Sequence, residues 1–295
     1  MEKLLTILTP THNRGKYLGD IFKVLQQQTN QNFEWMIVDD GSTDNTKEIV
    51  ESFIESNKLR IRYFYKENGG KHTAVNYGLK YISTKLTVIL DSDDTFTNDA
   101  VEVIEKIYSE NKNEKNICGF TFLRQRKNGE LFGKAFPREG RYNFSEWRLS
   151  KISAGERCDV FYSEIMKQYP FSEYEGEKYI GESTMMIKMS YKYDMIGKNI
   201  VIGISDYLEG GLTDSNRRLR LHSLLGSIEY CNLCMMPGIY WRRRLKSALL
   251  YDTYGFLKNI GPGKLINDSN APLLTTIFYP ISIIIGRYWK NKYKL

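Results

Sequence analysis

The sequence has no apolar run approaching the roughly 20 residues that a helix needs to cross a bilayer, and only 4 of its 295 residues are cysteines. Without a signal-peptide pattern at the N-terminus, so few cysteines predict a protein of the reducing cytosol, not a disulfide framework. Cys231 and Cys234 form a single C-x-x-C motif, and only His222 is nearby. We therefore interpret both cysteines as buried helix residues and not as zinc ligands.

Two nucleotide-binding signatures are also missing. The chain contains neither G-x-x-x-x-G-K-[ST] nor G-x-G-x-x-G, so kinase-type and dinucleotide-binding interpretations lose their main support. Positive charge is scarce outside the C-terminal segment. Residues 241–295 carry ten Lys and Arg against two Asp, a net charge of +8, whereas residues 1–240 sum to −1. We predict no nucleic-acid partner, because the basic excess is confined to a segment with an apolar face.

The composition that remains is that of a folded protein, with 41% hydrophobic and 26% charged residues. Because single cores stop growing at about 250 to 300 residues, the length predicts one large domain with a small appendage. We place the large domain at residues 1–235, with halves at 1–115 and 116–235. A basic, helical C-terminal extension follows at 236–295.

Short apolar runs alternate with helical patterns through the first half of the chain. This order predicts an α/β fold with an open, mostly parallel, twisted sheet flanked by helices. A polar segment follows each predicted strand, and such segments meet at the ligand-binding edge of a parallel sheet. The predicted strands are 4–9, 34–38, 61–65 and 86–90. Farther along, we expect a hairpin at 127–129, strands at 158–162 and 199–205, and helices at 180–193 and 216–233.

The segment Asp91-Ser92-Asp93-Asp94 directly follows the predicted strand 86–90. Alternation along an extended chain turns Asp91 and Asp93 to the same side. Two carboxylates there suit Mg²⁺ or Mn²⁺, which complete their coordination with water and phosphate oxygens.

Two other loops suit a nucleotide. Asp39 and Asp40 offer acceptors for a base or a ribose hydroxyl, although the same loop could simply cap a helix through Ser42, Asp44 or Asn45. The segment Asn68-Gly69-Gly70-Lys71 combines flexible backbone with a cation before a helix, which suits the approach of a phosphate.

Five motifs in this order resemble the motif series of family 2 glycosyltransferases: Thr9-Pro10-Thr11-His12-Asn13-Arg14, Val38 to Asp44, Asn68 to Lys71, Ala74-x-Asn76-x-Gly78 and Leu90 to Asp94. The resemblance implies a GT-A fold, a nucleotide-sugar donor with UDP favoured, a divalent metal (Mn²⁺ or Mg²⁺) and an inverting mechanism. It also implies roles for individual residues. Asp40 would contact the base, Asn68 and Lys71 would lie near base and ribose, and Asp93 with Asp91 would bind the metal and diphosphate. The remaining predicted nucleotide contacts are Thr9, Pro10, Asn13, Arg14 and Ser92.

The segments 171–182 and 207–213 resemble bacterial capsule and cell-surface polysaccharide transferases. Members of the family usually place a catalytic carboxylate here, often in a Glu-Asp pair, whereas this chain has Glu182-Ser183. We expect Glu182 to be the catalytic base, with Glu177 as second choice and Asp206 as a further candidate. The alternative is that both glutamates are solvated carboxylates favoured by a helix dipole.

The C-terminal segment from residue 273 has apolar residues at helical spacing and ends in Arg287, Lys290, Lys292 and Lys294. This pattern predicts an amphipathic helix on an anionic membrane surface. The enzyme would then be peripheral on the cytoplasmic face of the membrane, and the acceptor a saccharide or a lipid-linked saccharide. Alternatively, the helix docks on its own domain or on a dimer partner.

Two other functions remain open at this point. A non-catalytic nucleotide-sugar-binding module would bind the donor without turnover. A nucleotidyltransferase would also combine a parallel sheet, an Asp pair and a metal, but should have a glycine-rich basic loop after the first strand, and residues 10–14 are not such a loop.

Overall fold

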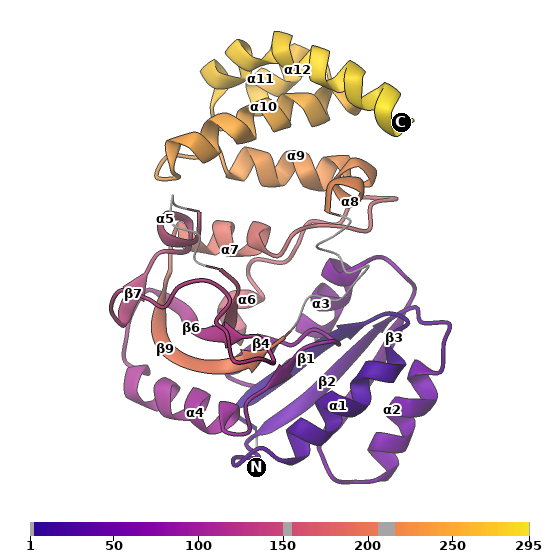
Figure 1. Cartoon of the computed structure of the whole chain (residues 1–295), viewed down its shortest axis with the longest axis vertical. Helices are drawn as coiled ribbons and strands as arrows, with labels where there is room; N and C mark the ends of the chain where they lie inside the picture. Colours follow the sequence, from indigo (N-terminus) through magenta and orange to yellow (C-terminus); the bar gives the residue numbers. More distant parts are fainter. Residues whose placement is uncertain (1–2, 150–154, 206–215, 295) are drawn as a thin grey trace. The chain divides into compact units, whose positions relative to one another are not determined.

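The computed structural model describes residues 3–149, 155–205 and 216–294 (Figure 1). The chain forms two compact units that are not consecutive in sequence. The first takes the described residues of 1–143, 154–170 and 192–208, and the second those of 144–153, 171–191 and 209–295. The division predicted after residue 235 falls inside the second unit, where Cys231 and Met235 share a core with Ala248 and Tyr251.

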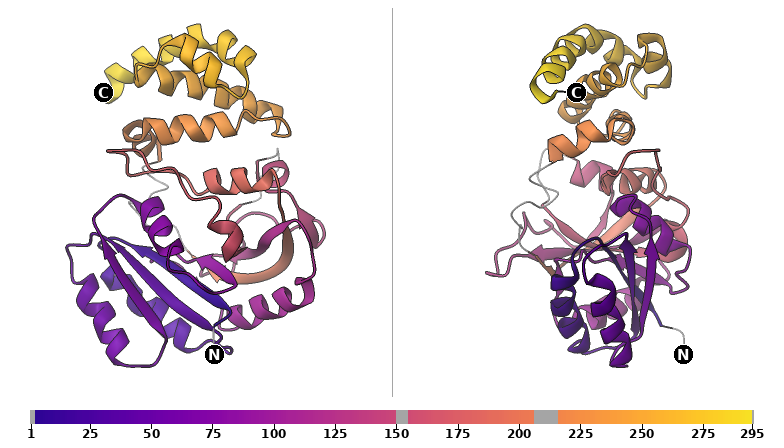
Figure 2. Two further views of the ribbon diagram at one scale, coloured as in Figure 1. Left: turned by 180° about the vertical axis from the view of Figure 1, so that it is seen from behind. Right: turned by 90° about the vertical axis from the view of Figure 1, so that its right-hand side faces the viewer.

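The first unit is built on a parallel half-sheet, as the alternating pattern predicts. The strand order β3-β2-β1-β4 is parallel throughout. Figure 2 shows these strands and their helices from two further sides. The strands are β1 (Leu5–Thr11), β2 (Phe33–Asp40), β3 (Ile61–Lys66) and β4 (Leu86–Ile89), and the helices are α1 (Gly15–Gln26), α2 (Thr46–Glu55), α3 (Lys71–Leu79) and α4 (Ala100–Asn111).

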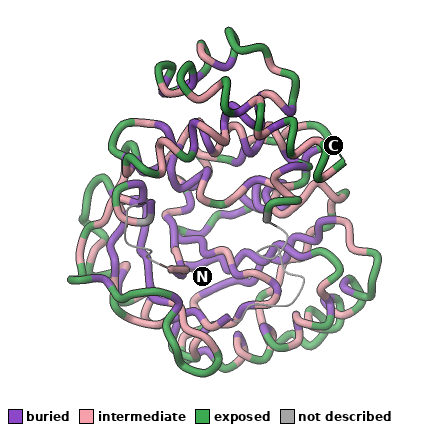
Figure 3. Tube along the Cα trace, turned by 45° about the horizontal axis from the view of Figure 1, so that its top comes forward, coloured by how far each residue is buried: buried purple, intermediate pink, exposed green. Residues whose placement is uncertain are grey.

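Both faces of this half-sheet are covered. Successive side chains of a strand point to opposite faces, so Ile7 and Trp35 join one core, which also contains residues of α1, α2 and α4. On the other face, Leu8 and Val38 lie against Gly78 of α3. Every residue of β1 and β2 is buried, whereas the edge strand β3 is mostly half-buried, and Figure 3 shows long buried stretches of chain. Burial of the inner strands is expected when helices cover both sides of a parallel sheet.

The sheet becomes mixed beyond β4. Strand β8 (Arg157–Tyr162) pairs antiparallel with β4 and with β6 (Ile117–Gln125), and β6 pairs parallel with β9 (Asp194–Ile204). Two short strands, β5 (Thr95–Phe96) and β7 (Gly140–Tyr142), pair with β9, and the short helix α6 (Ser163–Met166) follows β8. Strand β9 begins five residues before the predicted 199. Lys198 and Asn199 interrupt its apolar pattern where its register with β6 shifts.

The predicted hairpin turn at 127–129 is confirmed, because the N–H of Gly129 donates to the carbonyl of Arg126 over 2.9 Å.

Helices make up the second unit. The predicted helix 216–233 is two helices, because Ser223 has φ −132° and ψ 68° and begins the second of them. The predicted helix 180–193 is shorter, at Ser183–Ser190. The helices are α5 (Phe144–Arg148), α7 (Ser183–Ser190), α8 (Asn216–His222), α9 (Leu224–Leu233), α10 (Trp241–Leu257), α11 (Pro262–Asp268) and α12 (Pro272–Tyr293).

The C-terminal helix α12 packs on α10 through small buried residues. Ser282 and Gly286 are buried there, against Leu249 and Phe256 of α10, and the Ser282 hydroxyl donates to the Leu249 carbonyl over 3.0 Å. The predicted apolar stripe is therefore divided. Leu274, Phe278 and Trp289 pack against the core of the unit, whereas five large apolar side chains stay exposed: Leu273, Ile277, Ile281, Ile284 and Tyr288. In the part of the chain that the structure describes, no helix is long and apolar enough to span a membrane.

Asp252 of α10 is an ionisable group inside this helical unit. Its side chain is fully buried, and among the described residues neither carboxylate oxygen has a hydrogen-bond partner. Burial raises the pKa of Asp252 from 3.8 to about 7. The folded chain therefore binds this proton more tightly than the unfolded chain, so the stability of the fold falls as the pH rises between these two values.

We expect Asp252→Asn to remove part of this pH dependence. Between about pH 4 and about pH 7 the wild type should lose the stability that protonated Asp252 contributes, and the variant should lose less, since each pKa unit corresponds to about 1.4 kcal/mol. Calorimetric melting temperatures across this range measure the difference. Asp268→Asn, at an exposed acid of the same unit, is the control. Parallel pH profiles for wild type and Asp252→Asn would contradict the prediction.

Candidate functional site

The loops after β1 and β2 are joined by Asn13. Its Oδ1 accepts hydrogen bonds from the N–H groups of Thr43 (2.7 Å) and Asp44 (3.3 Å). In return, the Asn13 N–H donates to the Ser42 hydroxyl over 2.9 Å. Asn13 has a φ of 52°, in the left-handed region that Asn tolerates better than most residues. One side chain therefore holds two loops together at the carboxyl edge of the sheet.

Asp40 organises the loop between β3 and α3. Its Oδ1 accepts hydrogen bonds from Lys66 Nζ (2.8 Å) and the Gly69 N–H (2.9 Å), and its Oδ2 accepts from the Gly70 N–H (2.7 Å). The Asn68 side chain donates to the Asp40 carbonyl over 2.9 Å. The carboxylate is only 3% exposed. Here Asp40 holds the loop, and its predicted contact with the base remains a prediction.

Two glycines are required for this geometry. Gly41 has a φ of 78°, and a Cβ there would lie 2.7 Å from the Asn68 nitrogen. Gly70 has a φ of 95° at the start of α3. A residue with a side chain would be strained at these positive φ angles. Gly41 and Gly70 are therefore needed for the backbone conformation of the two loops.

The acidic segment after β4 meets three cations. Lys71 Nζ pairs with Asp91, and Arg14 Nη1 lies 3.8 Å from Asp93 Oδ2. Burial alone would raise the pKa of Asp91, but the charge and hydrogen bond of Lys71, together with the charges of Arg124 and Arg14, lower it by more, so the net pKa shift is downward. The structure therefore brings together the predicted residues Arg14, Lys71, Asp91 and Asp93.

The third cation, Arg124 of β6, pairs with Asp94. Burial lowers the pKa of Arg124, but the charge of Asp94 and those of its other acidic neighbours together raise it by more, so the net pKa shift is upward and the guanidinium stays charged. Sequence reasoning missed Arg124 because no motif surrounds it and its partner is 30 residues away.

Thr9 and Pro10 form part of the framework beneath these loops. Both are buried in β1, and the Thr9 hydroxyl accepts a hydrogen bond from Trp35 Nε1 over 2.9 Å. Ser92 is 7% exposed. Nucleotide contacts for these three residues remain predictions, and the structure gives Thr9 a partner in the core.

Of the three capping candidates in the β2 loop, Asn45 is the N-cap residue of α2, but its side chain makes no capping hydrogen bond. The preceding Asp44 provides one instead. Its carboxylate accepts the Thr46 N–H over 3.1 Å at the start of α2. Burial raises the pKa of Asp44, but the hydrogen bonds from Thr46 and Gly15 lower it by more, so the net shift is downward.

The two candidate bases, Glu177 and Glu182, lie in the second unit. Glu177 is buried, and its Oε1 and Oε2 accept the N–H groups of Leu225 (2.8 Å) and Gly226 (2.9 Å) in the first turn of α9. Glu182 directly precedes α7 and is exposed. Asp206, the further candidate, and the segment 207–213 lie outside the described residues.

The acidic segment fits a hard divalent cation of the kind expected. Within the described residues, no group of three or more His, Cys, Asp and Glu is placed to hold a metal. Mg²⁺ and Mn²⁺ commonly use only one or two carboxylates together with water and phosphate oxygens. Asp93 suits this role, since its side chain is 28% exposed and its contact with Arg14 is long. The isolated pair Cys231 and Cys234 is buried in and just after α9, as expected.

Sequence comparison decides the family. The model of Glycosyl transferase family 2 matches residues 6–162, slightly more than half of the chain and including every loop described above. The chain belongs to this family. A family 2 glycosyltransferase transfers sugars, and the fold described here is the GT-A fold of that family.

Curated relatives of this family 2 glycosyltransferase are bacterial. It is 37% identical over 105 residues to Glycosyltransferase GlyG of Streptococcus pneumoniae, a match that covers 35% of each chain. It is 26% identical over 189 residues to a Campylobacter jejuni enzyme named GalNAc(5)-diNAcBac-PP-undecaprenol beta-1,3-glucosyltransferase, covering 63% of this chain and 59% of that one. The matched segments thus span less than two thirds of these relatives.

Solved structures share the fold of this family 2 glycosyltransferase over almost its whole length. Staphylococcus aureus TarS, residues 1–349 in complex with UDP-GlcNAc, superposes with a TM-score of 0.65 at 17% identity, covering 99% of this chain and 91% of that one. Mannosyltransferase PcManGT from Pyrobaculum calidifontis, in complex with GDP-Man and Mn²⁺, gives 0.56 at 17% identity over 98% and 88%. At these identities the likeness concerns the fold.

Proposed function

We propose that this family 2 glycosyltransferase moves a hexosyl or N-acetylhexosaminyl group from a nucleotide-diphosphate sugar to a saccharide hydroxyl, with inversion, in bacterial surface polysaccharide synthesis. The supporting observation is the cluster of Arg14, Lys71, Asp91 and Asp93 at the sheet edge. It offers cations for a diphosphate and carboxylates for a metal. UDP is the favoured nucleotide, in line with the UDP-GlcNAc complex of TarS.

Asp93, with Asp91 beside it, would hold Mn²⁺ or Mg²⁺. Such an ion, when bound, neutralises charge on a departing diphosphate by Lewis-acid action. Arg14 and Lys71 pair with these same carboxylates, so they can turn to phosphate oxygens when the carboxylates take another partner. Asn13 and Asp40 hold the surrounding loops in place.

We assign the catalytic base to Glu182, because a general base must lie where an acceptor hydroxyl can approach it. Both oxygens of Glu177 already accept backbone hydrogen bonds from α9. Glu182 is exposed and directly precedes α7.

Calorimetric titration of UDP, GDP and dTDP, each with and without Mn²⁺, tests the donor site. One nucleotide should bind at least about tenfold more tightly with the metal, which links phosphate oxygens to the carboxylates. If no nucleotide binds under any condition, the proposal fails. If a nucleotide binds but its sugar is neither hydrolysed nor transferred, the chain is a donor-binding module without catalysis.

We also propose that α12 attaches the enzyme to an anionic membrane surface, at the cytoplasmic face, where it would meet a lipid-linked saccharide acceptor. The exposed side chains Leu273, Ile277 and Ile284 are 56–73% accessible. The same helix ends in Arg287, Lys290, Lys292 and Lys294, whose charges complement anionic headgroups. One face of α12 thus packs against the core of the unit, and the opposite face is exposed and can contact lipid.

The double variant Ile277→Ser/Ile284→Ser tests this attachment. It should lose most binding to phosphatidylglycerol vesicles, because about 0.8 kcal/mol is lost for each CH₂ no longer buried in lipid. Vesicle co-sedimentation measures the change, and Ile54→Ser, at an exposed residue of α2, is the control. Substitution is preferable to deletion of α12, whose inner face belongs to the core. Unchanged co-sedimentation of the double variant would overturn the proposal.

A further inference from the structure

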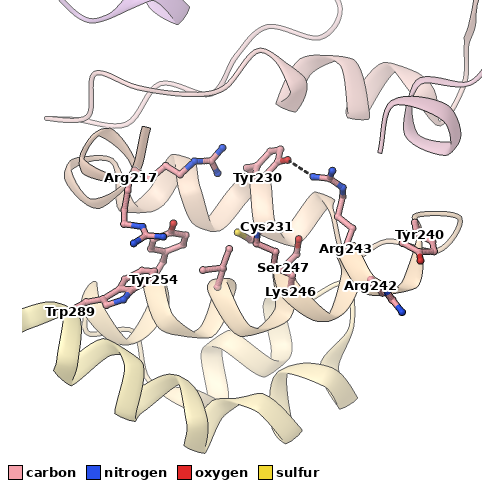
Figure 4. Close-up of a pocket in the computed structure, with 12 residues that line it drawn as sticks. Arg217, Tyr230, Cys231, Tyr240, Arg242, Arg243, Lys246, Ser247, Tyr254 and Trp289 are labelled. Carbon is pink, nitrogen blue, oxygen red and sulfur yellow. Dashed lines mark hydrogen bonds between the residues drawn. The ribbon is translucent and has the colours of Figure 1, made fainter. Parts of the chain in front are cut away.

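A second candidate ligand site lies within the helical unit. It is a pocket of about 680 Å³ between α8, α9 and α10, with Trp289 of α12 at one end (Figure 4). Three tyrosines and Trp289 contribute rings, and no Asp or Glu lines the pocket among the described residues. Five cationic side chains line it: Arg217, Arg220, Arg242, Arg243 and Lys246.

Most of this positive charge has no acidic partner. Within the described part of the chain, no ion pair involves Arg217, Arg242, Arg243 or Lys246. In the same unit, by contrast, Lys188 is paired with Glu229 over 2.5 Å. Like charges gathered in one pocket repel one another, by about 1 kcal/mol for a pair 4 Å apart even in water. A bound anion would relieve this repulsion.

Neutral contacts position two of these guanidinium groups. Arg243 donates to the Leu149 carbonyl over 3.2 Å and to the Tyr230 hydroxyl over 3.4 Å, the contact drawn in Figure 4. Arg217 lies 5.9 Å from the Trp289 ring centre. Such contacts fix the position of a guanidinium and leave its charge for a ligand.

We propose that this pocket binds a phosphate or diphosphate group carried by the glycosyl acceptor. Arginine forks match phosphate oxygens in pairs, and the volume exceeds that of a lone phosphate and is typical of organic ligands. The aromatic rings offer apolar faces to the rest of the ligand. That the ligand is an acceptor rests on the proposed transferase function. That the ligand carries a phosphate group is inferred only from the residues that line the pocket.

The test is calorimetric titration of the full chain with inorganic pyrophosphate and with farnesyl diphosphate, in EDTA to remove the metal that the proposed donor site needs. Both should bind, more weakly at high salt. Arg243→Gln/Lys246→Gln should weaken both at least about tenfold. Lys264→Gln, at an exposed lysine of the same unit, should have no effect. Arg242→Gln is a second variant, since Arg242 stacks on the exposed Trp241 and its loss should leave the fold intact.

The outcomes separate the sources of the phosphate. Tighter binding of farnesyl diphosphate than of pyrophosphate identifies a lipid-linked diphosphate, and equal binding identifies a phosphate group in a polymer or free in solution. If neither probe binds, or if both bind equally to all variants, the inference is overturned. Binding of UDP with Mn²⁺ should survive the pocket variants. If wild type does not bind UDP with Mn²⁺, that result would instead count against the proposed function.

Discussion

Asp93→Ala is expected to abolish metal-dependent nucleotide binding and to lower kcat/KM at least about 100-fold, because the ion loses its principal protein ligand. The fold should persist, since the Asp93 side chain is partly exposed and its contact with Arg14 is long, at 3.8 Å. Removing Asp93 also frees the Arg14 charge. Residual binding of UDP without metal should therefore stay the same or increase, which mere damage to the site would not produce.

Titration of UDP with and without Mn²⁺, together with initial rates of donor hydrolysis or transfer, measures both effects. Asp20→Asn, at an exposed acid on α1 of the same unit, is the matched control and should behave as wild type. Metal-dependent binding that survives in Asp93→Ala would show that the ion is held elsewhere, and the assignment of Asp93 would be wrong.

Glu182→Gln should lower kcat at least about 100-fold and leave the KM for the donor nearly unchanged, because glutamine keeps the shape but cannot accept the proton. Glu177→Gln should act differently. Its new NH₂ group faces a backbone N–H of α9 in place of an accepting oxygen. Leaving that buried donor unsatisfied costs about 1 to 3 kcal/mol of the free energy of unfolding.

Transfer rates and melting temperatures of the two variants distinguish catalysis from structure. If Glu182→Gln is fully active and Glu177→Gln is folded but inactive, then Glu177 is the catalytic base and Glu182 is not. If both variants keep full activity, neither glutamate is the base, and Asp206 is the next residue to substitute.

The sequence predicts residues 1–115 well because the signals there are local. Strands β1 to β4 each combine an apolar run with a polar loop, and the predicted bounds differ from the structure by at most two residues. Contacts between residues far apart in the sequence have no such local signal and could not be predicted. Arg124 meets Asp94 across 30 residues, and Asp40 holds the β3 loop through backbone groups, neither of which has a signature in sequence.

The helical half was harder to predict because its boundaries depend on distant partners. The break at Ser223 separates α8 from α9, and the carboxylate that receives the first N–H groups of α9 comes from Glu177, nearly 50 residues earlier. The sequence assigns the basic residues after Trp241 to one basic C-terminal extension, 236–295. In the structure, Arg242, Arg243 and Lys246 line a pocket, whereas the cations after Arg287 lie at the end of α12.

The link that Asn13 makes between the β1 and β2 loops has a thermodynamic consequence. Ordering a loop residue costs about 1 to 2 kcal/mol of conformational entropy, and a ligand that organises its own site must supply that amount for each residue. Here Asn13 fixes Thr43 and Asp44, and Asp40 fixes Gly69 and Gly70, through contacts within the protein. A nucleotide bound at this edge, as proposed, would meet loops whose ordering was completed during folding, and its binding would carry a smaller entropic penalty.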